Sequence, residues 1–188
     1  MNPTRLFILG ALAKHGPMYG HQLRRDARID RTEMWSEVRP GSLYSALHRL
    51  AAESLIEALR TEQDGQLPAR TVYGITAEGL RELRALRAEA LQEIRVPPDP
   101  VDLALAMSGE VSEDTLRGYL EDRVRSLSAR ASELDHQQER AWPDQTVADD
   151  LVVEHLRLRI QAELSWHRLV LDQLGKLATD ANMESHTT

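Results

Sequence analysis

Apolar residues recur at steps of three and four along most of this chain, the pattern of helices that bury one side. It predicts helices over about 4–15, 19–27 and 39–57, and the third is the most informative. One side of that helix is apolar, whereas the other is small, polar and basic. The predicted buried stripe is Leu43, Ala46, Leu47, Leu50 and Ala51, and the outer side collects Gly41, Ser45, His48, Arg49 and Ala52, with Ser42 and Tyr44 on its flanks.

The pattern changes after the third helix. Residues 55–60 and 70–75 are rich in Leu, Ile, Val and Tyr, and the pair Asp64-Gly65 between them is a turn signal. They predict a β-hairpin whose long loop projects as a wing. Thr76 then caps a further helix, with Glu78 in its first turn.

Three prolines at positions 97, 98 and 100 end any helix that reaches them, and they place a domain boundary there. Beyond them we expect helices over 101–107, from Ser112 onward and over 147–178, followed by a disordered tail at 179–188. The fold class is therefore mostly α. A winged helix-turn-helix domain over 1–96 precedes an all-helical domain over 97–178.

Composition narrows the class of protein. The chain has 188 residues, 41% of them apolar, and no cysteine, so disulfides, thiolate metal sites and cysteine nucleophiles are excluded. The net charge of −7 is uneven, because residues 1–96 carry 14 basic and 12 acidic residues and the remainder carries 9 and 18. The acidic second half is unsuited to DNA, but the first half can present a basic surface. Neither a signal peptide nor a membrane-spanning run is found, which predicts a cytoplasmic protein that contacts no membrane.

Four segments of the first half resemble a known family in their order and spacing. They are Leu-Phe-Ile-Leu-Gly-Ala-Leu at 6–12, Gly-Pro-Met-Tyr-Gly-His-Gln-Leu at 16–23, Pro-Gly-Ser-Leu-Tyr-Ser-Ala-Leu-His-Arg-Leu at 40–50 and Arg-Thr-Val-Tyr-Gly-Ile-Thr-Ala-Glu-Gly at 70–79. On these segments the chain resembles the PadR-like transcriptional regulators. The second half resembles members with a long helical dimerisation region only in its general layout.

The resemblance implies a homodimer that binds an inverted-repeat DNA operator, with each third helix in a major groove and each wing beside it. The half-sites would lie roughly 34 Å apart. It also implies repression that is relieved by a small aromatic or drug-like ligand. The expected DNA contacts are Ser42 and Tyr44 to phosphate, Ser45, His48 and Arg49 nearer the bases, and Arg39, Gln22, Arg60 and Arg70 around them.

Residues for the ligand are harder to choose. The candidates are Trp35, Met107, Trp142 and Trp166. Large apolar side chains at helical spacing usually pack in a core or a dimer contact, and that interpretation is kept beside the ligand-binding one.

Other classes of protein are weaker interpretations. An enzyme needs a positioned nucleophile, paired carboxylates or a metal cluster, and the seven histidines show no ligand spacing, so no catalytic residue, metal or cofactor is expected. Packing on the last helix explains His155 and His167 better. A helical protein-interaction module has no need of an outward Arg49 and His48. A MarR-type regulator also carries a winged motif, but normally places a dimerisation helix ahead of it.

Overall fold

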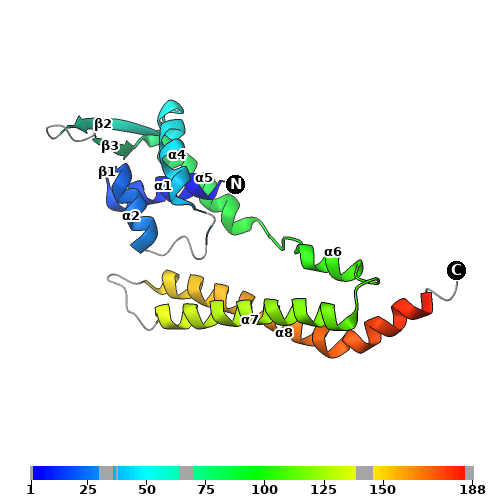
Figure 1. The fold of residues 1–188 in the computed structure, drawn as a ribbon. Helices are drawn as coiled ribbons and strands as arrows, with labels where there is room; N and C mark the ends of the chain where they lie inside the picture. Colours follow the sequence, from blue (N-terminus) through cyan, green and yellow to red (C-terminus); the bar gives the residue numbers. More distant parts are fainter. Residues whose placement is uncertain (1, 30–35, 37, 64–69, 139–145, 185–188) are drawn as a thin grey trace. The chain divides into compact units, whose positions relative to one another are not determined.

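The computed structural model describes residues 2–29, 36, 38–63, 70–138 and 146–184. The chain divides into two compact units, Met1–Arg95 and Val96–Thr188. Figure 1 shows a small sheet among helices in the first unit, whereas the described residues of the second unit form helices without strands. The mostly helical fold class with a winged amino-terminal unit is thereby confirmed.

The described residues of the first unit form the helices α1 (Pro3–His15), α2 (Gly20–Ile29), α4 (Pro40–Ala52) and α5 (Ala77–Gln92). The side chain of Asn2 accepts a hydrogen bond from the Arg5 amide and so caps the start of α1. Gly16 ends that helix at a φ of 78°, a left-handed conformation that only glycine adopts at little cost. Thr76 caps α5 as predicted, accepting from the Gly79 amide at 3.0 Å.

A three-stranded antiparallel sheet adjoins these helices, with β1 (Met18–Tyr19), β3 (Arg70–Ile75) and β2 (Ile56–Glu62) in that order. The hairpin of β2 and β3 was predicted, whereas β1 was not. Tyr19 was expected in the second helix, but it pairs with Val72 at the edge of the sheet. Two residues are too short for a strand pattern, and a pairing across some fifty positions leaves no local signal.

The third predicted helix is shorter than expected. It was predicted over 39–57, but α4 ends at Ala52 and β2 begins at Ile56. Ser54 has a positive φ of 59°, which reverses the chain between the two elements. Leu55 and Ile56 are apolar like a helical stripe, yet they are buried as the entry to the strand.

The core of the first unit lies where α1, α2, α4 and α5 meet the sheet. Its fully buried side chains include Ile8, Leu9, Leu12, Leu23, Leu43, Leu47, Leu50 and Ile56. Of the stripe predicted on α4, Leu43, Ala46, Leu47 and Leu50 are buried and Ala51 is half-buried. The opposite side of α4 is thereby forced to face solvent.

The second unit contains α6 (Pro100–Ala106), α7 (Glu113–Gln138) and α8 (Val147–Glu184), and α7 lies beside α8 (Figure 1). Leu120, Leu134, Ile160, Leu164 and Leu174 are buried. The last helix was predicted to end at about 178, with an unstructured tail after it. It continues to Glu184, since residues 177–184 contain neither Pro nor Gly to stop it.

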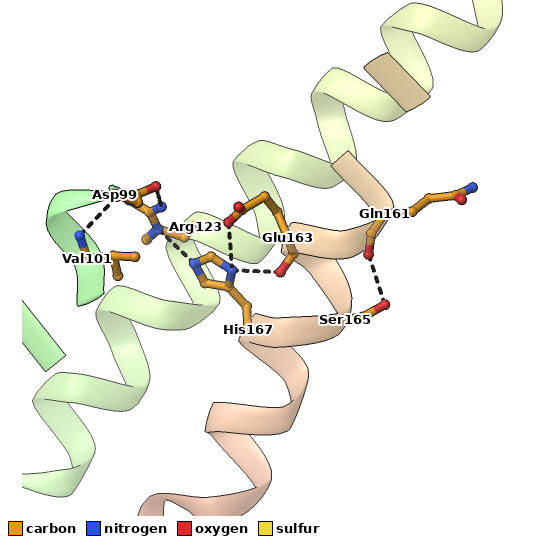
Figure 2. A network of polar contacts seen from close by, with 7 residues as sticks. All are labelled: Asp99, Val101, Arg123, Gln161, Glu163, Ser165 and His167. Carbon is orange, nitrogen blue, oxygen red and sulfur yellow. Dashed lines mark hydrogen bonds and ion pairs between the residues drawn. The ribbon is translucent and has the colours of Figure 1, made fainter. Parts of the chain in front are cut away.

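A chain of polar contacts crosses the second unit, as Figure 2 shows. Asp99, the residue before α6, accepts hydrogen bonds from the Val101 amide and from Nη2 of Arg123, each with a donor–acceptor distance of 2.9 Å. Nε of Arg123 donates a hydrogen bond to Nε2 of His167 at a distance of 2.7 Å. Nδ1 of His167 lies 2.8 Å from the Glu163 carbonyl oxygen. His167 is fully buried, as predicted, but His155 is exposed, so packing does not explain that residue.

Candidate nucleic-acid interface

The exposed face of α4 is polar and basic. Tyr44, Ser45, His48 and Arg49 lie on it, and Arg39 is exposed directly before the helix. Pro40 occupies the first turn, where its missing N–H leaves no hydrogen bond unmade. Hydroxyl, imidazole and guanidinium groups on one helix can donate to phosphate oxygens and to base edges in a major groove.

Tyr44 is held by packing and still reaches solvent. A Cβ at Gly20 would lie 3.0 Å from Cε1 of Tyr44 and 3.1 Å from Cδ1 of Leu47, so α2 and α4 approach closely at this glycine. The side of the ring is therefore supported by α2. Tyr44 nevertheless keeps 46% of its surface exposed, which leaves its edge available to a ligand such as DNA.

Three of the predicted contact residues on α2 and α4 already make hydrogen bonds within the unit. The hydroxyl of Ser42 donates to the Arg39 carbonyl at 2.8 Å, and that of Ser45 donates to the Ser42 carbonyl at 2.9 Å. Gln22 uses its Oε1 to accept from the Tyr19 amide at 2.8 Å. Ser42 and Gln22 are also half-buried, so both help to hold α4 and α2 in place.

Arg60 and Arg70 lie on the wing, on strands β2 and β3, and both are exposed. Nε of Arg60 donates a hydrogen bond to Oε1 of Glu62 at a distance of 2.5 Å, and the hydroxyl of Tyr19 donates to the other carboxylate oxygen. These bonds, first that from Tyr19 and then that from Arg60, lower the pKa of Glu62 below its usual value. Tyr19 and Glu62 raise the pKa of Arg60 in turn.

The sequence did not predict this contact, because Tyr19 was expected in a helix and Glu62 was not considered. The alternation of Arg60 and Glu62 at two-residue spacing was visible in the sequence, since such residues share one face of a strand. Tyr19 could not be found in that way. It joins the pair only because the edge strand β1 lies on the same sheet.

The ligand candidates are scattered. Trp35 and Trp142 lie outside the described residues. Met107 follows α6 and is 77% exposed. Trp166 is half-buried and packs against the cluster of Leu120, Val170 and Leu174. Its ring meets the ring of His167 edge-on, with the two centroids 4.8 Å apart. The structure does not bring Met107 and Trp166 into one described site.

The described residues contain neither a candidate metal-binding group nor a helix that could span a membrane. Within them, no group of three His, Asp or Glu side chains could hold a metal ion. No helix in that part of the chain has an apolar stretch long enough to cross a bilayer.

The first unit of the chain matches a known protein family. Residues 8–85 match the model of the transcriptional regulator PadR-like family. No curated protein sequence matches the chain at a significant level.

Solved structures of transcriptional regulators and of a virulence activator share the fold. Bacillus subtilis PadR in complex with operator DNA is 19% identical, with a TM-score of 0.73 over 92% of this chain and 99% of that one. The same regulator in complex with p-coumaric acid is 20% identical, with a TM-score of 0.69 over 91% and 98%. The Vibrio cholerae virulence activator AphA is 17% identical, with a TM-score of 0.69 over 93% and 99%. The matched residues 8–85 span α4 and both strands of the wing, so the similarity to the PadR-like transcriptional regulator family covers most of the first unit.

Proposed function

We propose that this chain is a PadR-like transcriptional regulator that binds duplex DNA through the exposed face of α4, with the wing beside it, and acts as a repressor in the cytoplasm. The observation that carries the proposal is the division of α4 into a buried apolar side and a face bearing Tyr44, Ser45, His48 and Arg49. The operator complex of the similar PadR supports it. Arg39 adds positive charge directly before the helix, and Arg60 and Arg70 add positive charge on the wing.

Tyr44 is the residue that best tests the interface. Tyr44→Ala removes both the supported ring and the hydroxyl, whereas Tyr119→Ala removes an exposed tyrosine from α7 in the second unit. Fluorescence anisotropy against genomic fragments that the wild type selects should show at least tenfold weaker binding for the first variant, a loss of roughly 1.4 kcal/mol. The second should bind like wild type. Equal affinity of both variants contradicts the proposed interface.

Salt dependence provides an independent measurement. If the bound protein neutralises about 6 to 10 phosphates, its affinity should fall by roughly three to five decades between 50 and 200 mM salt. A flat response would show that phosphate contacts do not drive binding.

We further propose that two copies associate through α8. Val147, Leu151, Leu158 and Leu169 are exposed by 54% to 75%. At 100° per residue they fall within about 40° of one another, so they form one apolar stripe. A second copy can cover this stripe, and an inverted-repeat operator needs such two-fold symmetry.

Replacing apolar residues of the stripe tests the dimer. Leu158→Glu with Leu169→Glu should yield monomers in sedimentation velocity, because two buried charges per copy oppose association. Arg159→Glu also introduces a carboxylate, but at an exposed position about 100° around α8 from Leu158, and it should leave the dimer intact. A monomeric wild type would refute the homodimer.

Relief of repression by a small aromatic ligand is also a proposal. It is supported by the p-coumaric acid complex of the similar PadR. Titrating DNA-bound protein with a panel of aromatic acids, and following release by anisotropy, tests it. Failure of every compound would leave DNA binding intact but remove this class of effector.

A further inference from the structure

The wing carries an acidic residue between its two arginines. Glu62 shares one face of β2 with Arg60, and the backbone register places it opposite Arg70 of β3. Directly opposite residues of antiparallel strands have Cβ atoms about 5 Å apart. Glu62 is therefore close to both cations that the wing can offer to DNA.

Both oxygens of the Glu62 carboxylate are used. Oε1 accepts a hydrogen bond from Nε of Arg60 at a distance of 2.5 Å. Oε2 accepts one from the hydroxyl of Tyr19, which reaches across β3 from the edge strand. The ring of Tyr19 stacks on that of His21, with centroids 5.2 Å apart, so α2 also supports this position. Glu62 is thus held beside Arg60 from two other elements, unlike a carboxylate that swings freely in solvent.

The pair is exposed, which makes it a contact that DNA can compete for. The side chains of Arg60 and Glu62 keep 65% and 50% of their surface accessible. A guanidinium binds carboxylate and phosphate by the same kind of charge-assisted hydrogen bond. Because exposed ion pairs are weak, a phosphate can displace Glu62, but it must do so against the repulsion of that carboxylate.

We propose that Glu62 is a built-in competitor of DNA phosphate, which occupies Arg60 and keeps the affinity of the wing for DNA low. This inference rests on the proposed DNA-binding function. Its consequence is a regulator that leaves non-specific DNA readily, because the wing contributes little without the base contacts of α4. The lowered pKa of Glu62 keeps the competitor charged throughout the physiological range.

The test compares two carboxylates on the same strand. Glu62→Gln and Glu57→Gln each remove one negative charge per copy, and Glu57 is exposed and faces Gly74 in the register rather than an arginine. The probe is a labelled duplex of mixed sequence, because non-specific affinity depends mainly on phosphate contacts. Any general electrostatic gain therefore appears equally in both variants.

Glu62→Gln should bind this duplex roughly tenfold tighter than Glu57→Gln. Its plot of log affinity against log salt should be steeper by roughly 0.9 for each phosphate gained. Arg60→Ala combined with Glu62→Gln should lose the gain, since the freed arginine is what reaches the phosphate. Equal affinities and slopes for the two single variants would overturn the proposal.

Tyr19→Phe provides a second variant that changes no charge. It removes only the hydroxyl that holds Glu62, so we expect an affinity between those of wild type and Glu62→Gln, with an unchanged melting temperature. Lower affinity together with lower melting temperature would mean that the contact only holds the wing together, and would overturn the proposal. A wild type that selects no fragment from genomic DNA would refute the proposed function itself, so the two failures are distinguishable.

Discussion

Arg123 donates a hydrogen bond from its Nε to Nε2 of His167, at a distance of 2.7 Å, where α7 contacts α8. An arginine side chain can only donate, so Nε2 must accept and the proton of the neutral ring lies on Nδ1. From there it is donated to the Glu163 carbonyl oxygen at 2.8 Å. A fully buried imidazole thus has both nitrogens satisfied, and it orients the arginine that binds Asp99.

His167→Leu should destabilise the second unit. The leucine fills a similar volume but cannot accept from Arg123, whose Nε then loses its partner. A loss of about 1–2 kcal/mol in the free energy of unfolding is expected from urea titration. His155→Leu, an exposed position on the same helix, should change it by less than about 0.5 kcal/mol. Equal effects of the two changes would argue against the hydrogen bond.

Asp99 should make the second unit sensitive to acid. The Val101 amide, first, and then Arg123 lower the pKa of Asp99 from its ordinary value of 3.8. A lowered folded-state pKa adds stability above the ordinary value, and that stability is lost as the pH falls through the folded pKa. The difference in unfolding free energy between wild type and Asp99→Asn should therefore be constant near neutrality and shrink below pH 3.8. Asp102→Asn on α6 is the control, and a difference independent of pH would contradict the assignment.

Gly79→Ala should disrupt the first unit. An added Cβ would lie 2.0 Å from the Leu55 carbonyl oxygen and 2.8 Å from Cγ1 of Ile75, so the backbone that begins β2 would have to move. We expect a loss of about 3 kcal/mol on thermal or urea unfolding. Gly10→Ala in α1 meets no atom within 4 Å and should stabilise the helix by up to about 1 kcal/mol. Similar melting temperatures for the two variants would refute the close packing.

Gly20→Ala should weaken DNA binding without unfolding the unit. The new methyl would lie 3.0 Å from Cε1 of Tyr44, and the half-exposed ring can yield by moving off α2. Displacing a contact residue should cost about 1 kcal/mol of binding free energy, roughly fivefold in affinity. Anisotropy on selected genomic fragments measures this, with Gly10→Ala again as control. Unchanged affinity would mean that the position of Tyr44 does not matter to DNA.

Several features were readable in advance because they depend on neighbours in the sequence. The steps from Leu43 to Leu50 specify which side of α4 is buried, and Thr76 marks the start of α5. The hairpin followed from two apolar runs around Asp64-Gly65. The four quoted segments pointed to the PadR-like family before any fold was known.

Other features depended on residues far apart in the sequence. The extended third helix was wrong because the competition between helix and strand at Leu55 and Ile56 is decided by pairing with β3. A second pairing, on the other edge of β3, forms β1 and brings Tyr19 to the Glu62 carboxylate that binds Arg60. Composition counts Arg60 as a free cation, whereas the folded sheet gives it an acidic partner.

Local periodicity by itself determined the helices, their buried sides and the basic face of α4, because side-chain direction repeats with the backbone over a few residues. Tertiary structure alone decided which polar side chains are bonded within the protein and which remain free to contact DNA. Ser42 and Gln22 hold the fold, Arg60 is paired with Glu62, and His167 is buried on Arg123, whereas His48 and Arg49 stay exposed. The physical reason is that hydrogen bonds and ion pairs act over about 3 Å, a separation that folding sets and chain order does not.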